Sequence, residues 1–235
     1  MQKHTPKVWD VLTIFPDLVN SFAKIGIIER AIKQKLIKIT PIDLRKFGEG
    51  DRQAIDGRPY GGGVGMVLRP DILYKGISQW KRKHKGKKSI VCLLSPQGKV
   101  FDHKLAKRFA DYDSVLLVCG RYEGFDERIR KFVDLEVSIG DYILMGGELP
   151  ALVILESSSR FIPGVVGKFE STQGESFEEG KLEYPQYTKP ESWRVKGKNY
   201  KVPGVLLTGH HKKIEEWRNT ESLKRTKKRR PDLLS

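Results

Sequence analysis

The fold is decided by the stretch from Val115 to Pro150, which reads VLLVCGRYEGFDERIRKFVDLEVSIGDYILMGGELP. It contains two short apolar runs, Val115 to Cys119 and Leu135 to Ile139, and each run breaks into a glycine-rich loop. Such a run bounded by glycine is typical of a buried parallel strand, and glycine at its carboxyl end lets a ligand approach the backbone closely. A third apolar run, Ser89 to Leu94, ends in Ser95-Pro96-Gln97-Gly98. Because ligands of open α/β sheets bind beyond the carboxyl ends of the strands, these three junctions predict a single pocket.

Strands and helices alternate along the first two thirds of the chain. Besides the three runs above, apolar patterning predicts strands at 8–15 and 36–44, and Pro41 places the second at a sheet edge or a bulge. Helices are predicted at 18–24, 28–34, 71–80, 102–110, 126–132 and 148–161, with Asp17 and Asp102 as N-caps of the first and fourth. This alternation predicts a parallel sheet covered on both faces. Because knots are almost absent from proteins, the residues alone favour a Rossmann-like sheet.

The chain carries a formal net charge of +15, and its basic residues are clustered. Lys81 to Lys88 (KRKHKGKK) and Lys224 to Arg230 (KRTKKRR) each contain no acidic residue. Clusters of this kind indicate a polyanionic partner, and nucleic acid is the natural one. The alternative is that a lysine-rich loop only keeps the protein soluble, but two separate clusters favour nucleic acid.

The composition disfavours a membrane location and a protein metal site. No apolar run approaches the roughly 18 residues that span a bilayer, and the amino terminus shows no signal-peptide pattern, so a cytosolic location is expected. Cys92 and Cys119 lie in apolar runs, are too far apart for a CxxC site, and are predicted to be small core residues. The five histidines show no metal-ligand spacing. No metal ligands are therefore predicted.

Three sequence motifs carry a resemblance to a known family. LLSPQG (93–98), CGRYEGFDER (119–128) and SIGDYILMGGELPA (138–151) resemble, in order and spacing, the cofactor-loop motifs of bacterial tRNA (guanine-37-N1)-methyltransferases of the SPOUT class. The likeness extends over nearly the whole chain, through RPYGGGVGM (58–66), SRFIPGVVGK (159–168), YPQYTKPE (184–191), LLTGHH (206–211) and RRPDLL (229–234).

The resemblance implies an α/β fold with a trefoil knot. A knotted parallel-sheet SPOUT domain is expected at 1–161, where the segment after about residue 140 threads a loop formed by the preceding strands and helices. A flexible linker and active-site loop is expected at 162–180, and a small, mostly helical tRNA-binding domain at 181–235, with a helix from 210 to about 224. Helix 148–161 is apolar on more than one face and must be buried. The resemblance places it in a homodimer interface, and burial within one subunit is the alternative.

The resemblance also implies the reaction. The family transfers a methyl group from S-adenosylmethionine to N1 of guanosine at position 37 of tRNA, next to the anticodon, in a homodimer whose active sites draw on both subunits. A magnesium (Mg2+) requirement is a further family trait, although no dedicated metal cage is visible in the sequence. The donor, S-adenosyl-L-methionine, would be held by residues of the three motifs, many through the backbone: Leu94, Ser95, Pro96, Gly120, Tyr122, Glu123, Ser138, Ile139, Gly140, Tyr142, Leu144, Gly146, Gly147 and Pro150.

Methylation at N1 of guanine requires a base for the N1 proton and a cation for the charge that moves onto O6. By resemblance, Arg160 is this cation, although an arginine at a helix end is often a capping or salt-bridge residue. The family places an aspartate fifteen residues after this arginine, whereas this chain has Glu175 there. We expect Glu175 to be the general base, with Glu170 and Glu178 as the next candidates.

Segment 47–66 is polar and glycine-rich, and the resemblance places it near the active site, which suits its Asp56 and Arg58. A tight multi-glycine turn is the alternative.

A non-enzymatic RNA-binding protein would explain the charge but not the three cofactor loops. A nucleotide-dependent enzyme would explain the glycine loops, but the chain lacks Walker and dinucleotide-binding signatures.

Overall fold

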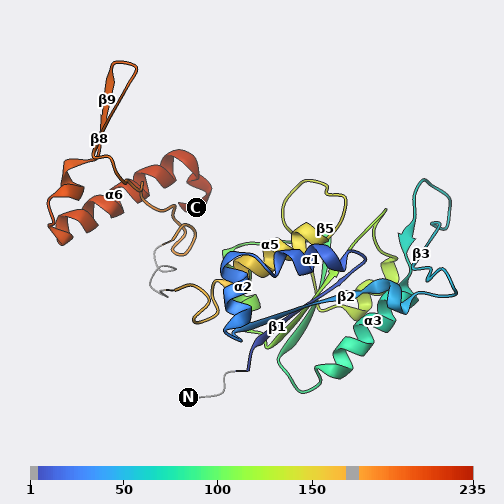
Figure 1. Ribbon diagram of the computed structural model, residues 1–235. Helices are drawn as coiled ribbons and strands as arrows, with labels where there is room; N and C mark the ends of the chain where they lie inside the picture. The colour runs from blue at the N-terminus through green and yellow to red at the C-terminus, as the bar shows by residue number, and fades with distance from the viewer. Residues whose placement is uncertain (1–4, 168–174, 235) are drawn as a thin grey trace. The chain divides into compact units, whose positions relative to one another are not determined.

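The chain forms two compact units, Met1–Phe169 and Glu170–Ser235. The computed structural model describes residues 5–167 and 175–234 (Figure 1). Within these residues, no helix is both long enough and apolar enough to cross a membrane. The first unit is an α/β domain built on one central sheet.

The central sheet has five strands in the order β2-β1-β6-β5-β7. These are β1 (Lys7–Thr13), β2 (Ile37–Asp43), β5 (Ser89–Val100), β6 (Ser114–Cys119) and β7 (Leu135–Ser138). All neighbouring pairs are parallel, which confirms the predicted sheet type. β2 lies at one edge, in agreement with its Pro41, because proline has no N–H to donate to a second neighbouring strand.

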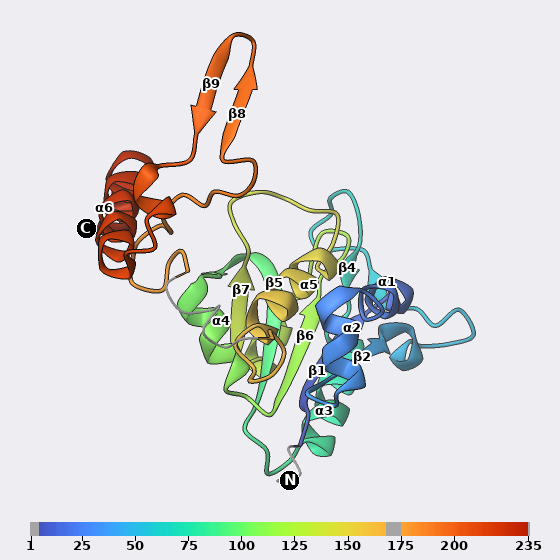
Figure 2. The same cartoon turned by 60° about the vertical axis from the view of Figure 1, so that its left-hand side comes forward.

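Helices cover both faces of the sheet, and each face has its own core. One core joins the sheet to α1 (Pro16–Phe22), α2 (Gly26–Lys33), α4 (His103–Ala110) and α5 (Glu148–Ser159) (Figure 2). The other joins it to α3 (Pro70–Lys83) and to the 3-10 helices η1 (Leu44–Phe47) and η2 (Glu127–Phe132). Successive side chains of a strand point to opposite faces, so strands buried on both faces read as continuous apolar runs.

Both cysteines lie in the core on the face of α4 and α5, as predicted. Cys92 is on β5 and Cys119 ends β6, and both are free thiols. Burial raises the pKa of both thiols above the usual value, so they stay protonated and behave as small apolar residues.

The helix ends confirm one predicted cap and correct two other predictions. Asp102 caps α4, and its carboxylate accepts a hydrogen bond of 2.7 Å from the Leu105 N–H. Asp17 does not cap α1, because Phe15 is the N-cap and Pro16 begins the helix; Asp17 lies in the first turn, where its charge complements the helix dipole. The segment predicted as a helix at 126–132 is the 3-10 helix η2. Such short connectors commonly take the tighter i to i+3 form.

Two predicted ends extend further in the structure. α3 continues to Lys83, so the first three residues of the basic cluster 81–88 lie in the last turn of a helix rather than in a loop. β5 does not end at Leu94, since it continues to Val100 after the segment 95–98 loops out. Leu94 and Lys99 both pair with Val137 of β7, and a Cβ at Gly98 would overlap the backbone nitrogen of Val137. Glycine is therefore required where the looped segment passes over β7.

The second unit combines one long helix with a β-hairpin. α6 (His211–Arg229) extends five residues beyond the predicted end near 224, so most of the second basic cluster lies on this helix. The 3-10 helices η4 (Gly204–Leu207) and η5 (Pro231–Leu234) flank it. The hairpin of β8 (Ser192–Val195) and β9 (Lys198–Lys201) was not predicted, and the description of this unit as mostly helical is incomplete.

The segment before the hairpin packs on α6. The N–H of Leu182 donates to Thr226 Oγ1 at 2.9 Å, and Ser222 Oγ donates to the Leu182 carbonyl at 2.6 Å. The rings of Tyr187 and Trp217 lie 6.3 Å apart. These contacts hold the segment 182–187 against α6.

Candidate active site

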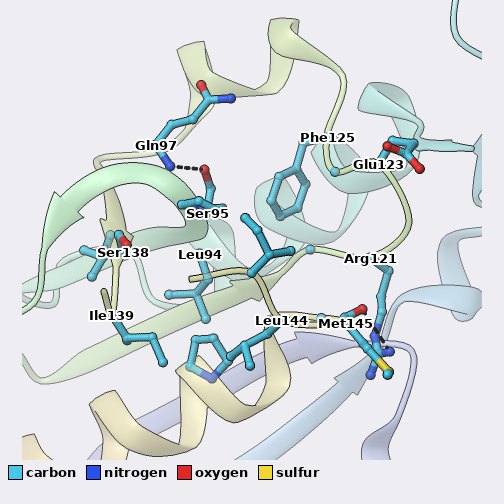
Figure 3. A pocket seen from close by; sticks show the side chains of 18 of the residues that line it. Leu94, Ser95, Gln97, Arg121, Glu123, Phe125, Ser138, Ile139, Leu144 and Met145 are labelled. Carbon is cyan, nitrogen blue, oxygen red and sulfur yellow. Dashed lines mark hydrogen bonds between the residues drawn. The ribbon is translucent and has the colours of Figure 1, made fainter. Parts of the chain in front are cut away.

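A pocket lies beyond the carboxyl ends of β6 and β7 and beside segment 95–98 of β5, which lies between them in the sheet (Figure 3). It encloses about 480 Å³, within the roughly 300–1,000 Å³ that is usual for small-molecule sites. All fourteen residues that the motifs predict for the donor site line this one pocket, together with nine others. The three predicted loops therefore converge in space as the strand order requires.

The pocket has an apolar part and a polar rim. Figure 3 shows Leu94, Ile139 and Leu144 close to one another on the side nearest α5. Ser95 lies on the opposite side, where its hydroxyl accepts a hydrogen bond of 3.0 Å from the Gln97 N–H. An apolar slot with backbone groups at its edge suits a flat heteroaromatic ring that is bound through main-chain hydrogen bonds.

A buried ion pair supports the floor of the pocket. Arg121, in the loop after β6, places Nη2 2.8 Å from Oε2 of Glu148, the first residue of α5. The other oxygen of Glu148 accepts a hydrogen bond of 2.7 Å from Thr13 Oγ1. Arg121 Nη1 also donates to the Met145 carbonyl at 3.3 Å. This arginine thus ties β6, the loop before α5 and α5 itself together.

The glycine-rich segment 47–66 lies against the pocket loop that follows β6. It contains β3 (Asp56–Gly57), which pairs with β4 (Val67–Leu68). The Leu68 N–H donates to the Gly124 carbonyl at 3.0 Å, and the Glu123 N–H donates to the Met66 carbonyl at 2.9 Å. Burial, with the nearby Asp56 carboxylate, raises the pKa of the Tyr122 phenol above its usual value. A polar loop with an acidic side chain therefore borders the predicted donor site.

A family comparison decides what kind of pocket this is. The model of the family described as tRNA (Guanine-1)-methyltransferase TrmD matches residues 8–235. The chain belongs to the tRNA (guanine-1)-methyltransferase TrmD family. This membership confirms the family and the enzyme class that the three loop motifs predict, and it decides against the two rival functions.

Three curated relatives, each bearing the name tRNA (guanine-N(1)-)-methyltransferase, show how far the similarity extends. The relative from Listeria innocua is 46% identical over 226 residues, which are 96% of this chain and 91% of the relative. Those from Latilactobacillus sakei and Clostridium tetani are each 46% identical over 225 residues, covering 96% of this chain and 89% and 91% of the relatives. The similarity to the TrmD family thus includes both units.

The two predicted catalytic residues of this TrmD family member lie in different units. Arg160 follows the last residue of α5 as its C-cap and is exposed. Glu175 is half-buried in the second unit, and its carbonyl accepts a hydrogen bond of 3.3 Å from the Glu178 N–H. Glu178 is half-buried as well, and Glu170 lies outside the described residues. Across 5–167 and 175–234, no group of three or more His, Cys, Asp or Glu side chains could hold a metal ion.

Sequence reasoning missed several polar residues of the pocket. Arg130 is the clearest: its Nη2 donates to Gln97 Oε1 at 3.2 Å, its Nε pairs with Glu127 at 2.7 Å, and it forms an ion pair with Glu136. Both Arg121 and Arg130 lie within or just after the motif CGRYEGFDER, so a charged residue in a cofactor loop was the available signal. Their partners come from other elements and only the fold reveals them.

Proposed function

We propose that this chain transfers a methyl group from S-adenosylmethionine to N1 of guanosine at position 37 of tRNA, as a cytosolic homodimer. One observation carries the proposal: the three family motifs line a single pocket beyond the carboxyl ends of β6 and β7 and beside segment 95–98 of β5. The pocket's size and its apolar slot fit a donor with a flat purine ring.

S-adenosylmethionine would be held by the fourteen motif residues that line the pocket. The slot formed by Leu94, Ile139 and Leu144 would take the adenine, and the backbone of the loops would supply its hydrogen bonds. At Gly146 a Cβ would meet the side chains of Arg121 and Glu148, and at Gly147 it would meet the backbone of Cys119 and Gly120, so glycine lets the walls of the pocket pack closely. When bound, this cofactor supplies an activated methyl group.

The protein's part in the reaction is to move a proton and to balance charge. In this proposal the Glu175 carboxylate accepts the N1 proton of the guanine, and the Arg160 guanidinium stabilises the negative charge that develops on O6. A general base of this kind contributes about 100- to 10,000-fold in rate. A magnesium requirement belongs to the proposal as a family trait only, and no step is assigned to the ion. Loss of activity on addition of EDTA, restored by magnesium, would test it.

The homodimer is supported by the outer face of α5. Its inner side chains Ile154 and Leu155 are fully buried in the core, whereas Leu149 and Val153 remain 55% and 46% exposed. Apolar side chains on the solvent face of a core helix commonly mark an interface. Sedimentation of the purified chain would show a dimer, and active sites shared between subunits would follow if two inactive variants, Arg160→Ala and Glu175→Gln, regained activity when mixed.

The trefoil knot and the tRNA-binding role of the second unit are further parts of the proposal. The family match and the parallel sheet in the order β2-β1-β6-β5-β7 support the knot. The linker and active-site loop would span 162–180. The basic residues that α6 carries in its last turns, Lys227, Lys228 and Arg229, support tRNA binding by the region 181–235.

The decisive experiment is transfer of a radiolabelled methyl group to tRNA transcripts. A transcript with guanosine at position 37 should be labelled, and the same transcript with adenosine there should not. Mapping of the product should find 1-methylguanosine at position 37. Equal labelling of the transcripts with guanosine and with adenosine at position 37, or no labelling of either, would overturn the proposal.

A further inference from the structure

The β8–β9 hairpin presents an aromatic pair that the folding of the second unit does not use. Trp193 and Tyr200 are cross-strand partners with ring centroids 5.8 Å apart, yet their side chains are 58% and 53% exposed. Figures 1 and 2 show the hairpin as an arm that extends away from α6. Tyr187, by contrast, packs against Trp217 of that helix. The aromatic pair on the arm thus faces solvent.

The arm has a tight turn at its tip and a hydrogen bond across its base. Its two strands join through Lys196 and Gly197, both with positive φ (48° and 75°), which is the backbone of a two-residue hairpin turn. At the base, the Val202 N–H donates to the Glu191 carbonyl at 2.9 Å. Within the described residues the two strands form a sheet of their own. All residues of the two strands except Val195 are exposed, so a ligand can reach their side chains.

The charges of the arm identify the ligand as an anion. From Lys189 to Lys201 the chain carries five basic residues and one acidic residue, Glu191. Within 175–234, no ion pair involves a basic residue of the two strands or the turn. Lys198 pairs with Val195 across the strands, and because side chains alternate, it lies on the same face as Trp193 and Tyr200. The aromatic face therefore carries a positive charge at its end.

We propose that the β8–β9 hairpin is an RNA-binding arm on which unpaired bases stack against Trp193 and Tyr200 while Lys196 and Lys198 contact their phosphates. Exposed rings flanked by cations are the recurring device for binding unpaired nucleotides, because every base has a π-face and every phosphate a negative charge. The inference rests on the proposed function, in which tRNA supplies the RNA. It goes beyond that function by assigning the contact to this arm and to unpaired nucleotides rather than to a duplex.

Two variants separate stacking from charge. Trp193→Val with Tyr200→Thr, the ring-free variant, removes the π-faces but keeps residues that favour strands, so the hairpin is preserved. Lys196→Gln with Lys198→Gln removes two charges and keeps the rings. The matched control, Trp193→Phe with Tyr200→Phe, keeps two rings and should bind as the parent does. Equal melting temperatures of the parent, the two test variants and the control would exclude a loss of folding.

The test measures binding of the full chain to a labelled stem-loop RNA and to a blunt duplex of the same stem, by fluorescence anisotropy over a range of salt. We expect the ring-free variant to bind the stem-loop about tenfold more weakly, with unchanged duplex affinity and unchanged salt dependence. The lysine variant should lose affinity and also show a salt slope shallower by about 0.7 per lost contact to a single strand. Parental stem-loop affinity in the ring-free variant, or equal losses on stem-loop and duplex, would overturn the inference.

Two further measurements keep the outcomes distinct. Methyl transfer by the parent at saturating tRNA tests the proposed function by itself. The ring-free variant should need a higher tRNA concentration to saturate, and at saturation it should reach the parental rate. Binding of the parent to vesicles of phosphatidylcholine and phosphatidylglycerol tests a membrane instead of RNA. Vesicle binding that is lost in the ring-free variant, with stem-loop binding unchanged, would overturn the RNA assignment.

Discussion

The N–H of Gly147 donates a hydrogen bond of 2.9 Å to the carbonyl of Gly120. This bond joins the loop before α5 to the loop after β6, two of the three walls of the pocket. A Cβ at Gly147 would lie 2.7 Å from the Cα of Cys119 and 2.7 Å from the nitrogen of Gly120, both of them backbone atoms that cannot rotate away. The two loops can meet only because this residue is glycine.

Substitution of Gly147 should therefore damage the donor pocket directly. We expect Gly147→Ala to weaken S-adenosylmethionine binding by at least tenfold, about 1.4 kcal/mol, because the walls must separate to admit one methyl group. Gly147→Val should abolish binding. Isothermal titration calorimetry measures the affinity. Gly204→Ala is the control, because a Cβ there meets open space and binding should not change. A folded Gly147→Val protein with parental affinity would remove these loops from the donor site.

The second prediction concerns the buried pair of Arg121 and Glu148. Glu148 is 1% exposed, so Glu148→Ala leaves both Arg121 and Thr13 without their partner. Breaking a buried pair in this way costs about 3–5 kcal/mol. We expect a matching loss in the free energy of unfolding by urea, together with weaker donor binding. Glu156→Ala, at an exposed position of the same helix, should change stability by no more than about 0.5 kcal/mol. Equal stability of the two variants would contradict this role.

Apolar runs in the sequence predict the strands of the sheet, but they do not predict which loop residues contact one another. β6 and the first half of β5 are predictable because strands buried on both faces are continuous apolar runs bounded by glycine. The second half of β5 is polar and pairs only because β7 lies beside it. The pair of Arg121 and Glu148 likewise depends on where α5 begins relative to β6, and no spacing in the sequence encodes it.

The hairpin of the second unit was missed for a different reason. β8 alternates polar and apolar side chains over only four residues, and β9 has a single apolar residue, so both are too short to give a clear strand pattern. Their turn has Lys196 where asparagine or aspartate usually supplies the signal. The lining of the pocket, by contrast, was predictable, because the family resemblance names those residues and the strand order brings the motifs together.

The basic end of α6 provides the third prediction. Replacing Lys227, Lys228 and Arg229 by alanine keeps the helix, because alanine is a strong helix former. We expect weaker tRNA binding and a salt slope flattened by up to about one unit for each lost phosphate contact. Filter binding at several salt concentrations measures both. Lys227→Arg with Lys228→Arg keeps the charge and should keep the slope, and donor affinity should be the same in all variants. An unchanged slope in the alanine variant would exclude these residues from the phosphate contacts.

The fourth prediction concerns a buried polar cluster at the other end of the sheet. His84, 4% exposed at the end of α3, places Nδ1 2.8 Å from Ser114 Oγ and Nε2 3.3 Å from Asp10 Oδ2. Trp80 Nε1 donates to the same Asp10 oxygen at 2.7 Å. Burial lowers the pKa of His84 below its usual 6.5; Asp10 opposes this shift, and two nearby lysines add to it. The imidazole is therefore held neutral in the folded protein.

The consequence for stability follows from proton linkage. Below pH 6.5 the unfolded chain binds a proton at His84 more readily than the folded chain does, so the free energy of unfolding falls as the pH falls. A single group of this kind changes the free energy of unfolding by at most about 1.4 kcal/mol per pH unit. Well above pH 6.5 it contributes no pH dependence. Urea unfolding of the parent and of His84→Gln at pH 7.5 and 5.5 tests this. From pH 7.5 to pH 5.5, the free energy of unfolding should fall more in the parent than in His84→Gln. An equal fall in both proteins would show that His84 is not the titrating group.

The last prediction concerns the general base, where this chain has glutamate in place of the aspartate that the family resemblance implies. Glutamate keeps the carboxylate and adds one methylene, and a misplacement of about 1 Å can cost on the order of a hundredfold in rate. Glu175→Gln keeps the shape but cannot accept a proton, so methyl transfer should fall by about 100- to 10,000-fold while donor and tRNA affinities persist. Glu175→Asp should stay active because it restores the family's residue.

The matched control is Glu179→Gln, at an exposed position of the same turn, which should methylate at the parental rate. Single-turnover transfer of labelled methyl, at donor and tRNA concentrations that saturate each variant, separates the chemical step from binding. If Glu175→Gln reacts as fast as the parent, the N1 proton leaves to another group, and Glu178→Gln and Glu170→Gln become the variants to measure. If all three react at the parental rate, the carboxylates of this segment take no part in proton transfer, and the base belongs to the pocket of the first unit.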